Sequence, residues 1–268
     1  MDVERTGNLD KPVDNNKREF IKNVCKGIAA IAIAPAVFRL LEPSEAFAMV
    51  QNTKRRWVFL VDTTKCIGCG FCVKACKKEN EISYDSPVSR TWVERYVVKK
   101  DGSTLIDSPM AGRDGFISSV VDGQSVAPGD IAKAFFVPKL CNQCENPPCV
   151  QVCPVGATYQ LKEGIVMVDR KWCIGCGYCI QACPYSARFF NPELKVAEKC
   201  NFCYHRISKG LKPACVQNCP VGARQLGNIK DPDDPVTKIV LNERVSVLKD
   251  EYGTDPQAYY LGLDKSVR

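Results

Sequence analysis

Sixteen of the seventeen cysteines in this 268-residue chain fall into four groups of four, and this pattern constrains the fold more than any other feature. In two groups the cysteines are separated by two, two and three residues, and in the other two only the gap before the third cysteine is longer. A chain of this length can build a core without disulfides or metals, so this many thiols indicate a bound inorganic cofactor. The groups are Cys66, Cys69, Cys72 and Cys76; Cys141, Cys144, Cys149 and Cys153; Cys173, Cys176, Cys179 and Cys183; and Cys200, Cys203, Cys215 and Cys219.

The first and third groups have the spacing of cysteines that bind iron-sulfur clusters. Three thiolates two residues apart can converge on one cubane cluster, while the fourth cysteine points to a neighbouring cluster. Glycines between these cysteines, such as Gly68 and Gly175, allow positive φ angles and let backbone N–H groups approach sulfur. Residues 65–72 repeat as residues 172–179, which indicates a common architecture. Lys77 follows the fourth cysteine of the first group, where the other groups have Pro154, Pro184 and Pro220.

The first 48 residues have the pattern of an export signal. A basic stretch that ends in residues 17–22 precedes twelve apolar residues at 27–38, and a small-residue cleavage site follows at 46–48. As a helix the apolar stretch would rise about 18 Å, which is too little for a bilayer core of about 30 Å. The pair Lys17 and Arg18 resembles the twin-arginine export signal, with lysine in the first place. A short buried helix is the alternative interpretation.

Cleavage after Ala48 would remove Cys25 and leave sixteen cysteines, four for each of four clusters. We therefore expect a signal peptide at 1–48 and a mature domain at 49–268. The signal carries as many acidic as basic residues, so the mature chain keeps the net charge of +7. Four clusters of about −2 each would bring the loaded protein to about −1, and no basic run or aromatic patch indicates nucleic-acid binding.

Two other uses of these thiols compete with iron-sulfur clusters. Zinc sites use paired Cys-x2-Cys motifs, and the second and fourth groups alone would fit them, whereas the first and third groups fit a cubane better. A disulfide framework would suit an exported protein. A twin-arginine type of signal, however, carries folded proteins with their cofactors, so clusters can be assembled in the reducing cytoplasm.

The rest of the composition excludes several classes of protein. A hydrophobic share of 45% and a charged share of 25% are ordinary for a globular chain of one or two domains, which excludes disordered and fibrous folds. The single histidine, His205, argues against histidine-based catalysis and multi-histidine metal sites. We expect His205 to be structural, because the thiols complete the ligand count.

The spacing between groups predicts an α+β fold of two interleaved modules, each like a bacterial two-cluster ferredoxin. The second and third groups are separated by a short stretch in which residues 164–169 predict a strand. Each group is expected to form a loop, a short helix after its fourth cysteine, and a strand. The inner module would comprise residues 141–183, and the outer module would comprise residues 66–76 together with 200–219.

The segments outside the groups predict a β-hairpin insertion and an extended C-terminal tail. In the insertion, residues 77–140, the stretch 91–98 reads as a strand and several glycines mark turns. The insertion could be a partner-docking surface or a lid over clusters. In the tail, residues 236–241 read as a strand. No apolar run of eighteen residues follows Ala48, so membrane association is expected only through partners.

The four groups in this order, with the stretches 140–149 and 213–215, resemble the four-cluster iron-sulfur (beta) subunits of complex iron-sulfur molybdoenzymes. These include polysulfide, thiosulfate, tetrathionate and dimethyl sulfoxide reductases, and the resemblance covers about residues 56–229. It implies four 4Fe-4S clusters and no catalytic residue on this chain. It also implies a periplasmic location and electron transfer in anaerobic respiration, between an integral membrane quinone-handling subunit and a molybdopterin or tungstopterin catalytic subunit.

The resemblance further implies crossed ligation, in which three cysteines of one group share a cluster with the fourth cysteine of another group. Crossed ligands would tie distant segments together, so loss of the clusters should unfold the protein. Some relatives have tryptophan at one ligand position and hold a three-iron cluster, whereas Cys176 and its neighbours are intact here. The implied sets are site A, Cys66, Cys69, Cys72 and Cys219; site B, Cys76, Cys200, Cys203 and Cys215; site C, Cys141, Cys144, Cys149 and Cys183; and site D, Cys153, Cys173, Cys176 and Cys179.

Three alternative functions remain open on the sequence. The same relay could serve a periplasmic nickel-iron hydrogenase or a sulfite-linked membrane redox complex. A free ferredoxin is a further alternative, which the long insertion and tail disfavour. A zinc scaffold without redox function is the last.

Overall fold

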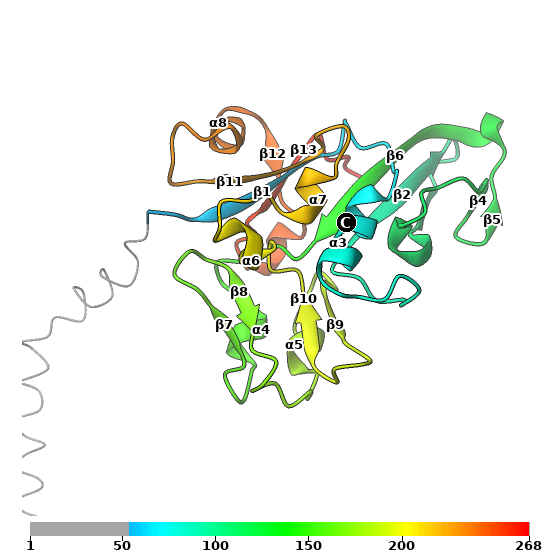
Figure 1. Cartoon of the computed structure of the whole chain (residues 1–268). Helices are drawn as coiled ribbons and strands as arrows, with labels where there is room; N and C mark the ends of the chain where they lie inside the picture. Colours follow the sequence, from blue (N-terminus) through cyan, green and yellow to red (C-terminus); the bar gives the residue numbers. More distant parts are fainter. Residues whose placement is uncertain (1–53, 268) are drawn as a thin grey trace, which may run out of the picture. The chain divides into compact units, whose positions relative to one another are not determined.

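The computed structural model describes residues 54–267, which form five small sheets joined by short helices (Figure 1). All these residues belong to one unit, Thr53–Arg268. The expected export signal, with Lys17, Arg18 and Ala48, lies outside the described residues. None of the helices within 54–267 combines the length and the apolar character that crossing a membrane requires.

A four-stranded sheet brings together segments from both ends of the described residues. Its second strand, β1, is apolar, and Val58, Phe59, Leu60 and Val61 are all fully buried. β11 pairs antiparallel with one edge of β1 and β13 pairs parallel with the other, so the order is β11-β1-β13-β12. The strands are β1 (Trp57–Asp62), β11 (Arg224–Asn228), β12 (Val245–Ser246) and β13 (Ala258–Leu261).

The insertion forms the β-hairpins that the sequence predicts. β2 pairs antiparallel with both β3 and β6, which confirms the predicted strand at 91–98. A second hairpin, β4 with β5, lies at the right edge of Figure 1. The elements are β2 (Thr91–Lys99), β3 (Thr104–Asp107), the 3-10 helix η1 (Pro109–Gly112), β4 (Val120–Val121), β5 (Gln124–Ser125), the 3-10 helix η2 (Pro128–Asp130) and β6 (Ile131–Leu140).

The short helices stand before the fourth cysteine of three groups, and the prediction of a helix after that cysteine is wrong. α4, α5 and α7 each contain the third cysteine and end two residues before the fourth. Proline after the fourth cysteine disfavours a helical conformation at that cysteine. In the first group Lys77 replaces proline, and α3 continues through Cys76. The helices are α3 (Phe71–Glu79), α4 (Pro148–Gln151), α5 (Tyr178–Gln181), α6 (Tyr204–Ile207) and α7 (Ala214–Gln217).

A strand follows the fourth cysteine in the last three groups. β7 follows Cys153, β9 follows Cys183 and β11 follows Cys219. β7 pairs with β8 and β9 pairs with β10, so two small hairpins form at the bottom of Figure 1, and β8 confirms the predicted strand at 164–169. The strands are β7 (Thr158–Gln160), β8 (Val166–Val168), β9 (Arg188–Phe190) and β10 (Ala197–Lys199).

The C-terminal tail differs from its prediction, because residues 236–241 form a helix and not a strand. α8 (Pro235–Asn242) begins after Asp234, whose carboxylate accepts hydrogen bonds from the backbone N–H groups of Val236 and Thr237. This N-cap and the proline at the first helical position outweigh the β-branched residues that suggested a strand. After the 3-10 helix η3 (Asp250–Tyr252), the tail adds β13 to the sheet, so it is not merely extended.

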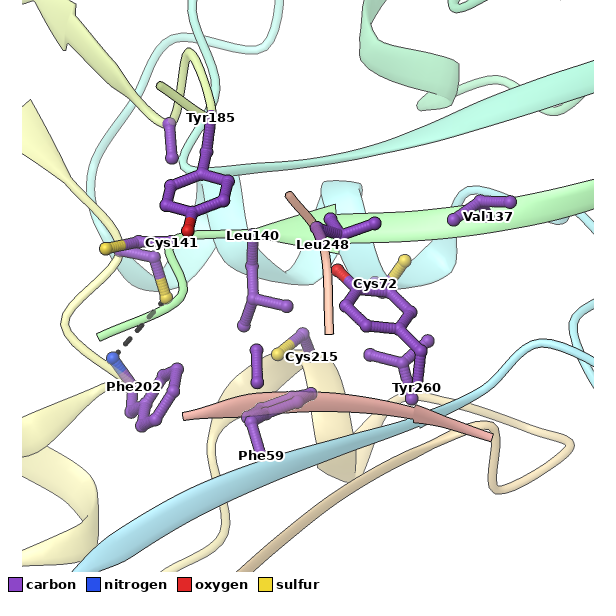
Figure 2. Packing of buried hydrophobic residues seen from close by; sticks show 14 of the residues in the cluster. Phe59, Cys72, Val137, Leu140, Cys141, Tyr185, Phe202, Cys215, Leu248 and Tyr260 are labelled. Carbon is purple, nitrogen blue, oxygen red and sulfur yellow. Dashed lines mark hydrogen bonds between the residues drawn. The ribbon is translucent and has the colours of Figure 1, made fainter. Parts of the chain in front are cut away.

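The main apolar core lies between the four-stranded sheet and the β2 and β6 strands of the insertion. Phe59 and Tyr260 come from the sheet, and Val137 and Leu140 come from β6 (Figure 2). Cysteines of three groups, Cys72, Cys141 and Cys215, belong to the same core. The fold therefore places much of the predicted cofactor chemistry inside its best-packed region.

Candidate iron-sulfur centres

Site A combines three cysteines of the first group with the last cysteine of the fourth group. Gly70 adopts a φ angle of 75° and starts α3, which directs the loop toward the sheet. Burial raises the pKa of the Cys66 thiol to about 11, although the backbone N–H of Gly68 lowers it. One cavity with about 310 Å³ of empty volume is lined by all four expected thiols, Cys66, Cys69, Cys72 and Cys219.

The insertion covers the cysteine loop of site A. A Cβ atom added at Gly68 would lie 2.6 Å from the ring of Phe136. One added at Gly70 would lie 2.2 Å from the carbonyl oxygen of Arg113. Both positions therefore require glycine, and this part of the insertion shields the loop.

Site C is built in the same way from residues of the second and third groups. Burial raises the pKa of the Cys144 thiol to about 12, and the thiol of Cys141 raises it further. Burial likewise raises the pKa of Cys183. A cavity with about 350 Å³ of empty volume is lined by the four expected thiols, Cys141, Cys144, Cys149 and Cys183.

Site B joins α3 to the fourth group. Because α3 packs against α7, the side chain of Cys76 reaches the other three expected thiols. Burial raises the pKa of Cys76 well above its ordinary value, and the thiols of Cys200, Cys215 and Cys203 raise it further. The backbone N–H of Phe202 donates to Cys200 Sγ over 3.4 Å, a contact drawn in Figure 2.

Site D is the most open of the four sets. Cys176 is exposed, and Cys173 is half-buried and packs on the apolar cluster that contains Cys179. Cys153 comes from the segment between α4 and β7 and accepts a backbone hydrogen bond from β7 over 3.4 Å. Burial alone would raise the pKa of Cys153, but backbone N–H groups lower it overall. Since α4 packs against α5, both contributing segments adjoin.

The sites follow one another in a single order, A, B, C and D. Burial raises the pKa of Cys215 in site B to about 12, and the nearby thiol of Cys72 in site A adds to the increase. Burial raises the pKa of Cys200 in site B, and the thiol of Cys141 in site C contributes. Cys179 of site D shares an apolar cluster with site C. Site A and site D are therefore the two ends.

Buried cations surround the sites, and the sequence interpretation missed them. Arg224 lines the cavity of site A and Arg188 lines that of site C. Arg90 faces Cys76 in site B, and buried Lys199 donates to the backbone carbonyl of Cys200. A signal for the first two was present, because Cys-Pro-x-x-Ala-Arg occurs in both the third and the fourth group.

The arginines fit a cluster with four thiolate ligands. Arg224 is 2% exposed, and none of its three guanidinium nitrogens makes a hydrogen bond among the residues that the structure describes. Nε and Nη2 of Arg188 are unpaired in the same sense. A buried charge without a partner is costly, so an anionic group is needed beside each arginine. An iron-sulfur cluster with four thiolates supplies such a charge.

The thiols and His205 bear on the alternatives. All sixteen cysteines between residues 66 and 219 are free, so the disulfide framework is not present in the described part. Within residues 54–267, no three Cys, His, Asp or Glu side chains are grouped to hold a single metal ion. His205 Nε2 lies 2.7 Å from Glu79 Oε1, in an ion pair that Arg206 shares.

Comparison with known proteins identifies the class of cofactor. Residues 65–157 and 132–229 each match the 4Fe-4S dicluster domain family. The tetrathionate reductase B subunit of Salmonella typhimurium is 39% identical over 94% of this chain and 90% of its own length. Its counterpart in Archaeoglobus fulgidus is 43% identical over 78% of this chain and 87% of its own length. The corresponding polysulfide reductase component of Wolinella succinogenes is 35% identical over 76% of this chain and 93% of its own length.

Proposed function

We propose, since this protein belongs to the family of 4Fe-4S iron-sulfur subunits of tetrathionate, dimethyl sulfoxide, polysulfide and thiosulfate reductases, that it relays single electrons within a multisubunit oxidoreductase. Its sixteen described cysteines hold four 4Fe-4S clusters at sites A to D. The ligation is crossed, and the two ferredoxin-like modules are interleaved. The chain carries no catalytic residue of its own, because bond chemistry takes place on a partner.

The observation that carries this proposal is the order of the sites. Sites A, B and C adjoin through Cys72, Cys215, Cys200 and Cys141, and site D adjoins site C. An ordered row with two ends suits a relay between two partners. A carrier that meets one partner at a time needs only one accessible end.

Both ends of the row present exposed apolar side chains on their cysteine loops. At site A, Ile67 is 57% exposed and Phe71 is 50% exposed. At site D, Trp172, Ile174 and Tyr178 are 68%, 65% and 57% exposed. Exposed apolar patches of this kind mark protein contact surfaces. Two partners, one at each end, follow from this distribution.

The chain's own residues determine what the sites can do. When bound, the clusters supply one-electron redox chemistry. The cysteines supply the thiolates, and the surrounding core excludes water from Cys72, Cys141 and Cys215. Backbone N–H groups that donate to Cys200 and Cys219 sulfur, over 3.4 and 3.3 Å, favour negative charge at these ligands.

We place this relay between a molybdopterin or tungstopterin catalytic subunit and an integral membrane quinone-handling subunit in the periplasm. The names of the relatives, subunits of respiratory-type reductases, support the catalytic partner. The expected export signal at 1–48 supports the location. Replacing Lys17 and Arg18 by glutamine should retain the protein in the cytoplasm, and export of this variant at the wild-type level would contradict the placement.

The test is elemental analysis of the complex purified anaerobically through a tag on this chain. We expect about sixteen iron atoms per chain, from four cubane clusters, with stoichiometric molybdenum or tungsten. Nickel in place of these metals would move the chain to a hydrogenase. Iron alone would contradict the pterin partner, and zinc without iron would contradict the relay itself.

A further inference from the structure

Two buried arginines occupy the same place in the two modules. Arg224 stands five residues after Cys219, and Arg188 stands five residues after Cys183. Each is the first residue of a strand, β11 and β9 respectively. The corresponding position after Cys153 is Thr158, and the first group has no arginine there. Each module therefore contains one arginine at this position.

Arg224 lies between sites A and B. It lines the cavity that the four thiols of site A share. Its charge also acts on Cys215 of site B, where it opposes the increase that burial causes in the pKa of that thiol. The side chain is 2% exposed. One guanidinium therefore faces two cluster sites and little solvent.

Arg188 has the equivalent place between sites C and D. It lines the cavity of site C and is 4% exposed. Burial works to lower its pKa, but the thiols of Cys149 in site C and Cys179 in site D raise it overall. Its Nη1 donates to Thr158 Oγ1 over 3.4 Å, which joins the two equivalent positions of the inner module.

The other buried cations near the sites have polar partners. Arg90 Nη2 lies 3.2 Å from Glu198 Oε2, so a carboxylate offsets much of its charge. Lys199 Nζ donates to the backbone carbonyls of Val166 and Cys200. Arg224 and Arg188 have no carboxylate partner among the ion pairs of the described part. Their charge is left to act on the clusters.

We propose that Arg224 raises the reduction potentials at sites A and B and that Arg188 raises those at sites C and D, so that each module is tuned as a unit. The inference rests on the proposed function, because it requires clusters at all four sites. On reduction each cluster gains one electron and no bond or proton is exchanged with the arginine. The fixed positive charge stabilises that added electron in a medium of low dielectric constant. Both arginines are positioning residues that touch no substrate.

The experiment is a redox titration, followed by electron paramagnetic resonance, of the whole complex with R224Q, R188Q or the control R244Q. Arg244 is an exposed residue of the tail. Signals are assigned to sites with one Cys→Ser variant per site. At fixed ambient potential, R224Q should lower the reduced-to-oxidised ratio at sites A and B by tenfold or more, which is 59 mV for one electron. R188Q should do so at sites C and D, and R244Q at none.

The proposal is wrong if R224Q keeps its iron and all four potentials, or if either variant shifts both pairs of sites equally. Should R224Q lose iron, R224K and R224M separate charge from packing. Iron retained in R224K and lost in R224M supports a requirement for the charge. Iron and wild-type potentials retained in R224M would overturn the proposal. Iron content and the four signals of the unmodified complex test the proposed function separately.

Discussion

The outer and inner modules carry the same cysteine motifs in different structural surroundings. Sites A and B of the outer module lie against the main core, beside Phe59 and Tyr260. Site D of the inner module lies beside a small separate cluster with Val166 and Ala197, between strands of three residues. Isolated two-stranded hairpins are marginally stable at best. One ligand pattern can thus be built into a core or onto its periphery, and the peripheral version depends more on its cofactor.

Removing iron should have the largest effect and should separate the two modules. Without clusters the hairpins β7–β8 and β9–β10 lose the ligands that join them, whereas β1 keeps its apolar contacts in the main core. Hydrogen exchange after anaerobic chelation should show residues 158–168 and 188–199 losing protection first. Uniform loss across both modules would contradict the difference between them.

Serine at the third cysteine of the first and third groups should give the next largest effect. Cys72 belongs to the main core and adjoins site B, whereas Cys179 belongs to the small cluster. We expect C179S to keep about three quarters of the iron and C72S about half or less, because each site holds about four iron atoms. Iron per chain after anaerobic purification checks this. Equal losses in the two variants would count against the coupling of sites A and B.

Alanine at two equivalent glycines should show a smaller difference. Gly70 and Gly177 have φ angles of 75° and 78°, so alanine costs about 1–2 kcal/mol at either position. Only at Gly70 would the new Cβ meet backbone, the carbonyl oxygens of Arg113 and Gly112, which adds about 1–3 kcal/mol. G70A should therefore lower the anaerobic unfolding temperature more than G177A does. The reverse ranking would show that the insertion does not constrain the site A loop.

The smallest effect is expected outside both modules, at the N-cap of α8. Asp234→Ala removes the acceptor for the backbone N–H groups of Val236 and Thr237 and should cost about 1 kcal/mol. The unfolding temperature should fall slightly while iron content stays unchanged. Loss of iron from D234A would mean that α8 supports a cluster site directly.

The cysteine pattern predicted the cofactor class and the strand at 91–98, because ligand spacing and alternation are local signals. It misplaced the short helices, since the effect of Pro154, Pro184 and Pro220 on the preceding residue was not used. It missed the helical course of 236–241, because the Asp234 cap was overlooked in favour of β-branched residues.

Other features depend on contacts between distant residues and could not be predicted from spacing. β13 pairs parallel with β1, which joins residues about two hundred positions apart. The burial of Arg224 and Arg188 depends on the cavities that the folded chain forms around them. The sequence motif was visible, but the absence of a carboxylate partner in the described part was not.

The relay itself is tested most directly by breaking an interior site. In a complex that carries Cys203→Ser at site B, reduction from one end is followed by freeze-quench electron paramagnetic resonance. A single row A, B, C and D predicts that electrons fill the clusters on the donor side of site B and that turnover of the partner subunit falls sharply. Reduction of every remaining cluster at the wild-type rate, with turnover unchanged and site B empty, would contradict it.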